Sequence, residues 1–205
     1  MCIIMLGDFM NKNDLRYIKT EKIIKESFIK LVNNKGFEKT SVSDICKEGI
    51  ISRNAFYLHF ADKYDLLERM FDEFGAMLIK SFGSKFDEKL FSKDILNLTQ
   101  IYTDAMSENR EAFLFLVNCS SLRMEQLISK IVIEDPVCRL SLDYKKAAQN
   151  IKVRLNRCYI FSAMVAYTKL WIENYDKISK EDATYELYKL CEYPTLMYIE
   201  NFKII

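Results

Sequence analysis

The single histidine of the chain, His59, lies in the stretch ISRNAFYLHFADKYDLL (residues 51–67), and Asp62 and Asp65 follow it closely. A histidine near carboxylates has the chemistry of a general base or of a metal ligand. The same residues also suit a short helical corner, in which the histidine is structural and the aspartates begin a helix. The elements around His59 must decide between these interpretations.

The composition favours an all-α protein, because the residues that mark turns between strands are scarce. Of the 205 residues, 5 are glycine and 2 are proline, while 50% are hydrophobic and 29% are charged. The six cysteines are scattered with no Cys-x-x-Cys pair, a spacing that suits neither a zinc site nor a disulfide framework. The longest apolar run, from Cys158 to Tyr167, is too short to span a bilayer. We therefore expect a cytoplasmic protein that is not bound to a membrane and holds no metal or cofactor.

Capping residues and helical spacing predict two short helices before and around His59. After a first helix over about residues 17–34, Thr40 or Ser41 can cap a short helix, and Asp44 lies three residues after Ser41, as in a capping box. Ser52 can cap the next short helix, over residues 53–59. A tight turn joins the two short helices, and a longer helix lies on each side of the pair. This order of elements is typical of a helix-turn-helix.

The second short helix has a polar side that suits nucleic acid. Arg53, Asn54 and Tyr57 fall on one side, whereas Phe56 and Phe60, four residues apart, fall on the other. Arginine can pair with guanine and asparagine with adenine in the major groove. Residues 1–63 carry 11 Lys and Arg against 8 Asp and Glu, a net charge of +3, which suits an anionic partner such as DNA. Chance unevenness in the distribution of charges explains this number equally well.

Residues 40–67, TSVSDICKEGIISRNAFYLHFADKYDLL, resemble the DNA-binding signature of the TetR family of bacterial regulators, and EKIIKESFIKLVNNKGFEKTSV before them resembles the first helix of that family. The resemblance extends over about residues 18–75. The chain departs from the family pattern at Cys46, where alanine is common, at Gly49-Ile50, where Ala-Gly is usual, and at Asn54, where glycine is common. The last two departures leave the operator sequence open.

The resemblance implies a homodimer that reads two half-sites of a pseudo-palindromic, double-stranded DNA operator. It implies two sets of contacts. The residues near phosphates are Ser41, Ser52, Tyr57, His59 and Lys63, and those facing bases are Arg53, Asn54 and Ala55. Under this interpretation His59 is the end of a recognition helix and not a catalytic group.

We expect two domains, a helix-turn-helix domain over residues 1–63 with a frayed arm at 1–16, and a larger helical domain for effector binding and dimerisation over 64–205. Further helices are predicted at about 91–106, 109–118, 120–133, 142–174 and 180–202, and Pro194 should kink or divide the last one. The last two helices should form the dimer interface. A pocket for a small-molecule effector of unknown identity could be lined by Tyr102, Met106, Phe113, Phe115, Met124, Met164, Tyr167 and Trp171, which the pattern explains equally as core residues.

These observations predict a ligand-responsive transcriptional repressor. An enzyme is not expected, because the chain has one histidine, no glycine-rich phosphate loop and no Gly-x-Ser-x-Gly elbow. The alternative is an interaction protein that keeps the helix-turn-helix fold but acts through a protein partner, as a co-activator or nucleoid-associated factor.

Overall fold

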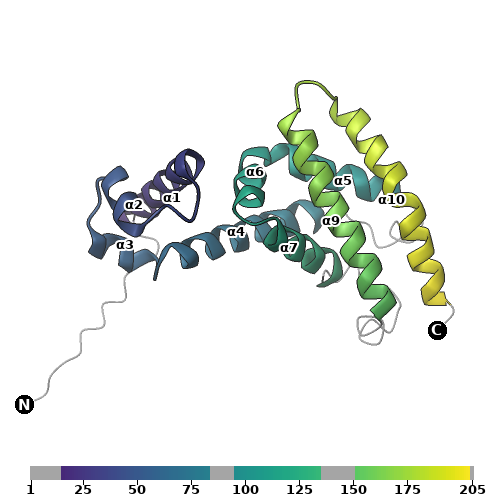
Figure 1. The fold of residues 1–205 in the computed structure, drawn as a ribbon, viewed down its shortest axis with the longest axis horizontal. Helices are drawn as coiled ribbons and strands as arrows, with labels where there is room; N and C mark the ends of the chain where they lie inside the picture. The colour runs from purple at the N-terminus through teal and green to yellow at the C-terminus, as the bar shows by residue number, and fades with distance from the viewer. Residues whose placement is uncertain (1–14, 84–94, 135–150, 204–205) are drawn as a thin grey trace, which may run out of the picture. The chain divides into compact units, whose positions relative to one another are not determined.

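The structure, a computed structural model, describes residues 15–83, 95–134 and 151–203, which form helices joined by short turns, with no strand among them. The all-α prediction is confirmed. The helices are α1 (Leu15–Lys35), α2 (Val42–Glu48), α3 (Arg53–His59), α4 (Lys63–Gly83), α5 (Ile95–Glu108), α6 (Arg110–Cys119), α7 (Ser121–Glu134), α9 (Ile151–Glu173) and α10 (Lys180–Lys203) (Figure 1).

The chain divides into two compact units, Met1–Arg69 and Met70–Ile205, which we call the first and the second unit. The division falls inside α4, so the first turns of that helix belong to the first unit. The predicted arm at residues 1–16 lies outside the described residues, except for Leu15 and Arg16, which begin α1.

In the first unit, α1, α2 and α3 pack around a small aromatic and aliphatic core. Phe28 of α1, Ile45 of α2 and Phe56 of α3 are each 0% exposed, and Leu66 from the start of α4 is also fully buried. Burying such side chains contributes roughly 1.5–3 kcal/mol each to folding. Because α2 and α3 are only seven residues long, this shared core must hold them in place.

The short helices begin where hydroxyl and carboxylate caps stand. Ser41 Oγ accepts from the Asp44 amide at 3.2 Å while the Asp44 carboxylate accepts from the Ser41 amide at 3.0 Å, which completes the predicted capping box. Ser52 Oγ accepts from the Ala55 amide at 3.0 Å, and Asp62 caps α4 in the same manner. Each cap contributes about 1 kcal/mol and marks a helix start. The predicted starts of α2, α3 and α4 are therefore confirmed.

The turn between α2 and α3 has an unusual backbone at Ile50. This residue has φ +51°, in the left-handed region that β-branched residues rarely adopt, and its side chain is 92% exposed. The preceding Gly49 is needed for a different reason, because a Cβ there would lie 2.9 Å from Ile23 Cγ2 and from Ser27 Oγ of α1. The turn thus has a glycine-like conformation at Ile50, the position where glycine is usual in the family. The glycine of this chain, Gly49, stands one position earlier.

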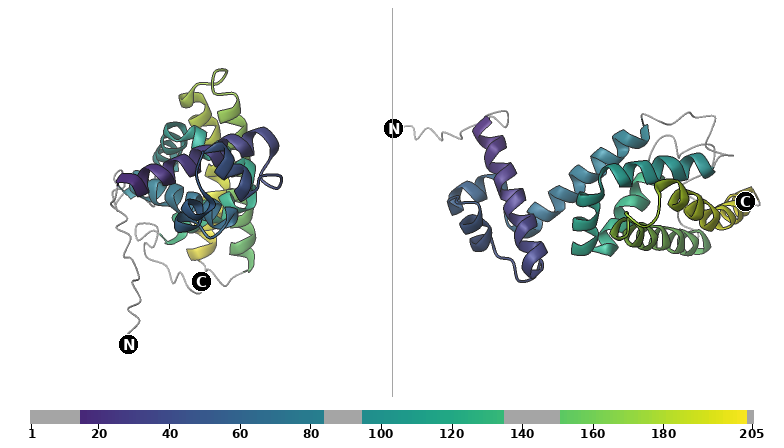
Figure 2. Two further views of the ribbon diagram at one scale, coloured as in Figure 1. Left: turned by 90° about the vertical axis from the view of Figure 1, so that its left-hand side faces the viewer. Right: turned by 90° about the horizontal axis from the view of Figure 1, so that it is seen from above.

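In the second unit, α5 packs along α10, and α6 and α7 pack against α9. The helices α9 and α10 lie side by side, joined by a short turn (Figures 1 and 2). The predicted helices over this part of the chain are present, with bounds that agree within two residues wherever the structure describes them. The parts predicted at 91–94 and 142–150 lie outside the described residues.

Pro194 was predicted to kink or divide the last helix, and the helix is not divided there. Helix α10 runs without a break from Lys180 to Lys203. A proline removes one backbone hydrogen bond from the helix, and a helix of 24 residues retains the others on both sides of it.

Candidate nucleic-acid interface

Helix α3 has one buried and one exposed side, as its spacing predicts. Phe56 and Phe60 are 0% and 1% exposed, and their rings lie 5.9 Å apart. On the other side, Arg53, Asn54 and Tyr57 are exposed, and Tyr57 retains 54% of its accessible surface. The exposed side therefore displays a guanidinium, an amide and a phenol from three residues within one turn of helix.

The side chain of Arg53 is held against α2. Its Nη2 donates a hydrogen bond to Ser43 Oγ, ten residues earlier in the chain. The charge of Arg53 also acts on the thiol of Cys46, whose pKa is raised by burial and partly lowered again by the nearby guanidinium. Ser43 and Cys46 are three residues apart on α2, so the guanidinium lies over that face of the helix. Sequence reasoning missed Ser43, because nothing local in the sequence links it to Arg53.

Ser41 and Ser52 are exposed at the starts of their helices, where their hydroxyls act as caps. The cap at Ser41 is reinforced from α1, since Lys35 Nζ lies 2.8 Å from the Asp44 carboxylate. The Lys35 contact, followed by the hydrogen bonds from Ser41, holds the pKa of Asp44 well below its usual range. Asp44 is therefore ionised at neutral pH, and it ties the start of α2 to the end of α1.

His59 is a buried residue and not a surface donor. It is 5% exposed, its ring centroid lies 3.9 Å from that of Tyr17 in α1, and Nδ1 has no hydrogen-bond partner among the described residues. The nearest carboxylate oxygen, from Glu21, is 3.9 Å from Nδ1. Burial lowers the pKa of His59, which favours the neutral ring. A phosphate contact does not agree with this burial, and His59 instead packs the end of α3 onto α1.

Lys63 is partly engaged inside the first unit. Its ammonium donates to the carbonyl oxygens of Phe37 at 3.0 Å and Glu38 at 3.1 Å, and it lies 4.6 Å from the centre of the Phe37 ring. Ala55, the third residue expected to face bases, is half-buried. The structure thus brings Arg53, Asn54 and Tyr57 to one exposed side, whereas Lys63 also holds the turn after α1.

Comparison with known proteins agrees with this geometry. Residues 29–70, which contain α2 and α3, match the family described as "Bacterial regulatory proteins, tetR family". Over 174 residues the chain is 23% identical to the fatty acid metabolism regulator protein of Bacillus subtilis (strain 168), an alignment that covers 79% of this chain and 90% of that protein. The chain belongs to the TetR family of transcriptional regulators.

Two further comparisons extend over the second unit of this TetR-family regulator. The chain is 29% identical over 136 residues to the dhaKLM operon transcriptional activator DhaS of Lactococcus lactis subsp. lactis (strain IL1403), covering 63% of this chain and 68% of that one. The fold is similar to that of a TetR transcriptional regulator from Streptococcus agalactiae 2603V, with a TM-score of 0.59 and 18% identity over 85% of this chain and 94% of that one. The compared regulators are DNA-binding proteins and not enzymes.

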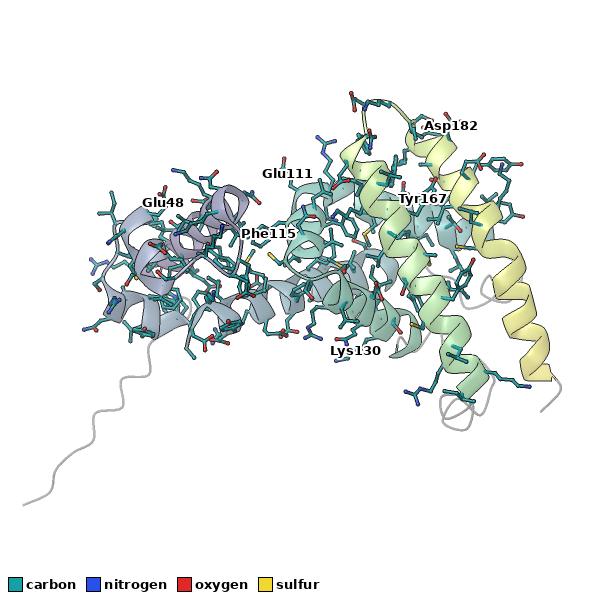
Figure 3. All side chains as sticks on the ribbon, viewed as in Figure 1. Glu48, Glu111, Phe115, Lys130, Tyr167 and Asp182 are labelled. Atoms are coloured by element: carbon teal, nitrogen blue, oxygen red, sulfur yellow. The ribbon has the colours of Figure 1, made fainter. Side chains whose placement is uncertain are left out.

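In this TetR-family regulator most of the residues predicted to line an effector pocket are packed in the core of the second unit. Those that are 5% exposed or less are Tyr102, Met106, Phe113, Phe115, Met124 and Trp171, whereas Met164 and Tyr167 are half-buried. Tyr102 shares a 2.8 Å hydrogen bond with Thr168, and burial raises the pKa of its phenol. Tyr167 reaches from α9 to the Ala183 carbonyl of α10 at 2.9 Å (Figure 3).

No group of histidine, cysteine, aspartate or glutamate that could hold a metal ion occurs within residues 15–83, 95–134 and 151–203. None of the helices described for these ranges is long and apolar enough to cross a membrane.

Proposed function

We propose that this TetR-family protein is a homodimeric, ligand-responsive repressor that binds a pseudo-palindromic operator through α3. The observation that carries the proposal is the exposed side of α3, where Arg53, Asn54 and Tyr57 face solvent while Phe56 and Phe60 are buried. A recognition helix needs this separation, because its core side must hold it rigidly while donors on the other side enter the major groove.

In this proposal Arg53, Asn54 and Ala55 face base edges, since they lie at the start of α3. Ser41, Ser52, Tyr57 and Lys63 lie near phosphates, which position the protein but do not read sequence. His59 is left out of the contact set because its ring is buried.

A second copy of the chain supplies the other half of the operator contact. Along α9, an exposed apolar stripe follows helical spacing and consists of Ile151, Leu155, Tyr159 and Leu170, each 60–67% exposed. On α10, Leu190 is 62% exposed, whereas Ala183 and Leu187 are buried within the chain itself. Exposed apolar faces of this extent favour a protein interface, and we place the dimer contact on α9 with Leu190 of α10 beside it.

The effector in this proposal is mainly apolar. Among the described residues of the second unit, the buried polar residues apart from Tyr102 and Trp171 are threonines, namely Thr99, Thr103, Thr168 and Thr184. The indole N–H of Trp171 is buried and finds no acceptor among the described protein groups, so an effector oxygen could accept from it. The relative named as a fatty acid metabolism regulator makes fatty acids the first class to test.

An effector experiment measures release of the protein from operator DNA as fatty acids of increasing chain length are added. We expect release at micromolar ligand by the wild type and weaker release by Trp171→Phe, which removes the N–H but keeps an aromatic ring. A reporter under operator control then gives the direction of regulation. Repression relieved by ligand supports the proposal, and activation of the kind named for DhaS contradicts the repressor part.

The experiment that tests DNA recognition is selection of binding sites from random duplex DNA at fixed salt. We expect enrichment of a palindrome with two equivalent half-sites. If the wild-type protein enriches no palindrome, the specific-regulator proposal fails, and an interaction protein that acts through another protein becomes the better explanation.

A further inference from the structure

We propose that Ser43 of α2 is a positioning residue for base readout, because it fixes the guanidinium of Arg53 at the surface shared by α2 and α3. This inference rests on the proposed DNA-binding function and adds to it a specificity-determining residue on a helix other than the recognition helix. The observation behind it is the hydrogen bond from Arg53 Nη2 to Ser43 Oγ.

The hydrogen bond to Ser43 also brings the charge of Arg53 near a second residue of α2. The charge of Arg53 acts on the thiol of Cys46, which lies one helical turn after Ser43. Cys46 is 7% exposed, so its position is set by the core of the first unit. The guanidinium therefore lies back against α2, where its hydrogen bond to Ser43 holds it.

The helix that carries Ser43 is itself rigidly held. Its start has the Ser41–Asp44 capping box, and the carboxylate of Asp44 is paired with Lys35 of α1. At its other end, Gly49 packs closely against α1. A hydroxyl on a helix held at both ends is a fixed acceptor, and a hydrogen bond to a fixed acceptor restricts the long arginine side chain.

This restriction has a consequence for base recognition. A free arginine side chain loses rotamer freedom when it docks on a guanine, which reduces its affinity. When Ser43 holds one N–H of Arg53, the other N–H groups of the planar guanidinium point in set directions and can still pair with a guanine edge.

The test combines binding-site selection with binding measurements on the selected operator and on operators changed at single positions. The proteins compared are the wild type, Ser43→Ala, Ser43→Thr, Arg53→Ala and the double variant. We expect Ser43→Ala to reduce the base preference at the position that Arg53 reads by about three- to tenfold, the effect of one hydrogen bond. Ser43→Thr should retain the preference, because it keeps the hydroxyl.

The double variant separates positioning from direct contact. If Ser43 acts through Arg53, Ser43→Ala changes no base preference in the Arg53→Ala background. If Ser43→Ala lowers binding to all sequences equally, or has its full effect in the Arg53→Ala background, Ser43 contacts DNA in its own right and the proposal is overturned. If the wild-type protein enriches no palindrome, the proposed function itself fails. Thermal unfolding of each variant controls for loss of fold.

Discussion

The first and second units are stabilised in different ways. In the first unit two seven-residue helices begin at specific caps, and the buried side of α3 stands directly behind an exposed polar side. In the second unit long helices pack through aliphatic and aromatic residues, and the buried polar contacts include hydroxyl pairs such as Thr103 with Thr184 at 2.7 Å. One unit depends on particular residues at particular positions, and the other depends on a repeating apolar pattern.

The family model matches residues 29–70, which lie in the first unit apart from Met70. A cap, a corner and a reading face each require certain residue types, whereas an apolar core accepts many hydrophobic combinations of similar volume. The first unit is therefore recognisable from a short motif. The second unit must be described by its packing, and its ligand and partner must be found by experiment.

The largest effect expected concerns the exposed stripe of α9 in the second unit. Leu155→Glu places a charge in the proposed dimer interface, where it would be buried without a partner, and we expect dimer dissociation to become easier by about 100-fold or more. Sedimentation equilibrium measures this. Leu122→Glu on α7 is the matched control, because Leu122 and Leu155 are 63% and 62% exposed. If the two variants dissociate equally, α9 does not form the dimer interface.

The next effect concerns the reading face of the first unit. Arg53→Ala should reduce discrimination against the wrong base at one position of each half-site by about 10- to 100-fold. Tyr57→Ala, on the same exposed side, should weaken binding to every operator sequence by the same factor, because a phosphate contact carries no sequence information. Titration of fluorescent operators with single base changes measures both. An unchanged base preference in Arg53→Ala would show that bases are read elsewhere.

A smaller effect is expected at the turn before α3. Ile50→Gly should raise the free energy of unfolding by about 1 kcal/mol, since glycine adopts the left-handed conformation at φ +51° without the steric cost that an isoleucine has there. Urea unfolding of the whole chain measures the change. Ile50→Val, which is also β-branched, should leave the stability near that of the wild type. A loss of stability in Ile50→Gly would mean that the exposed isoleucine makes a favourable contact.

The smallest effect is the pH dependence of the first unit. Burial lowers the pKa of His59 below its ordinary value of 6.5, so the unfolded chain takes up a proton at a higher pH than the folded chain. Stability is therefore complete above about pH 6.5 and decreases as the pH falls toward the lowered pKa. Glu21 opposes this shift, and Arg69 and Lys25 add to it. Urea unfolding at several pH values should show the decrease in the wild type and not in His59→Gln, and an equal decrease in both would assign it to other groups.

Much of the first unit could be predicted because its signals are local. Ser41, Ser52 and Asp62 act within three residues of their own positions, so a reader of the sequence can place α2, α3 and the start of α4. The partnership of Ser43 with Arg53 could not be predicted, because it depends on how α2 and α3 cross. The burial of His59 depends in the same way on the packing of Tyr17 against it.

The sequence by itself determined the helical class, the helix-turn-helix and the polar side of α3, since helical period, caps and glycine positions act over a few residues. Only the tertiary structure decided which of the predicted polar residues are exposed and so available to contact DNA. It buried His59 against α1, engaged Lys63 with the Phe37 and Glu38 carbonyls, and joined Arg53 to α2. The physical reason is that burial and hydrogen bonding between helices depend on distances between residues far apart in the chain, which no local pattern contains.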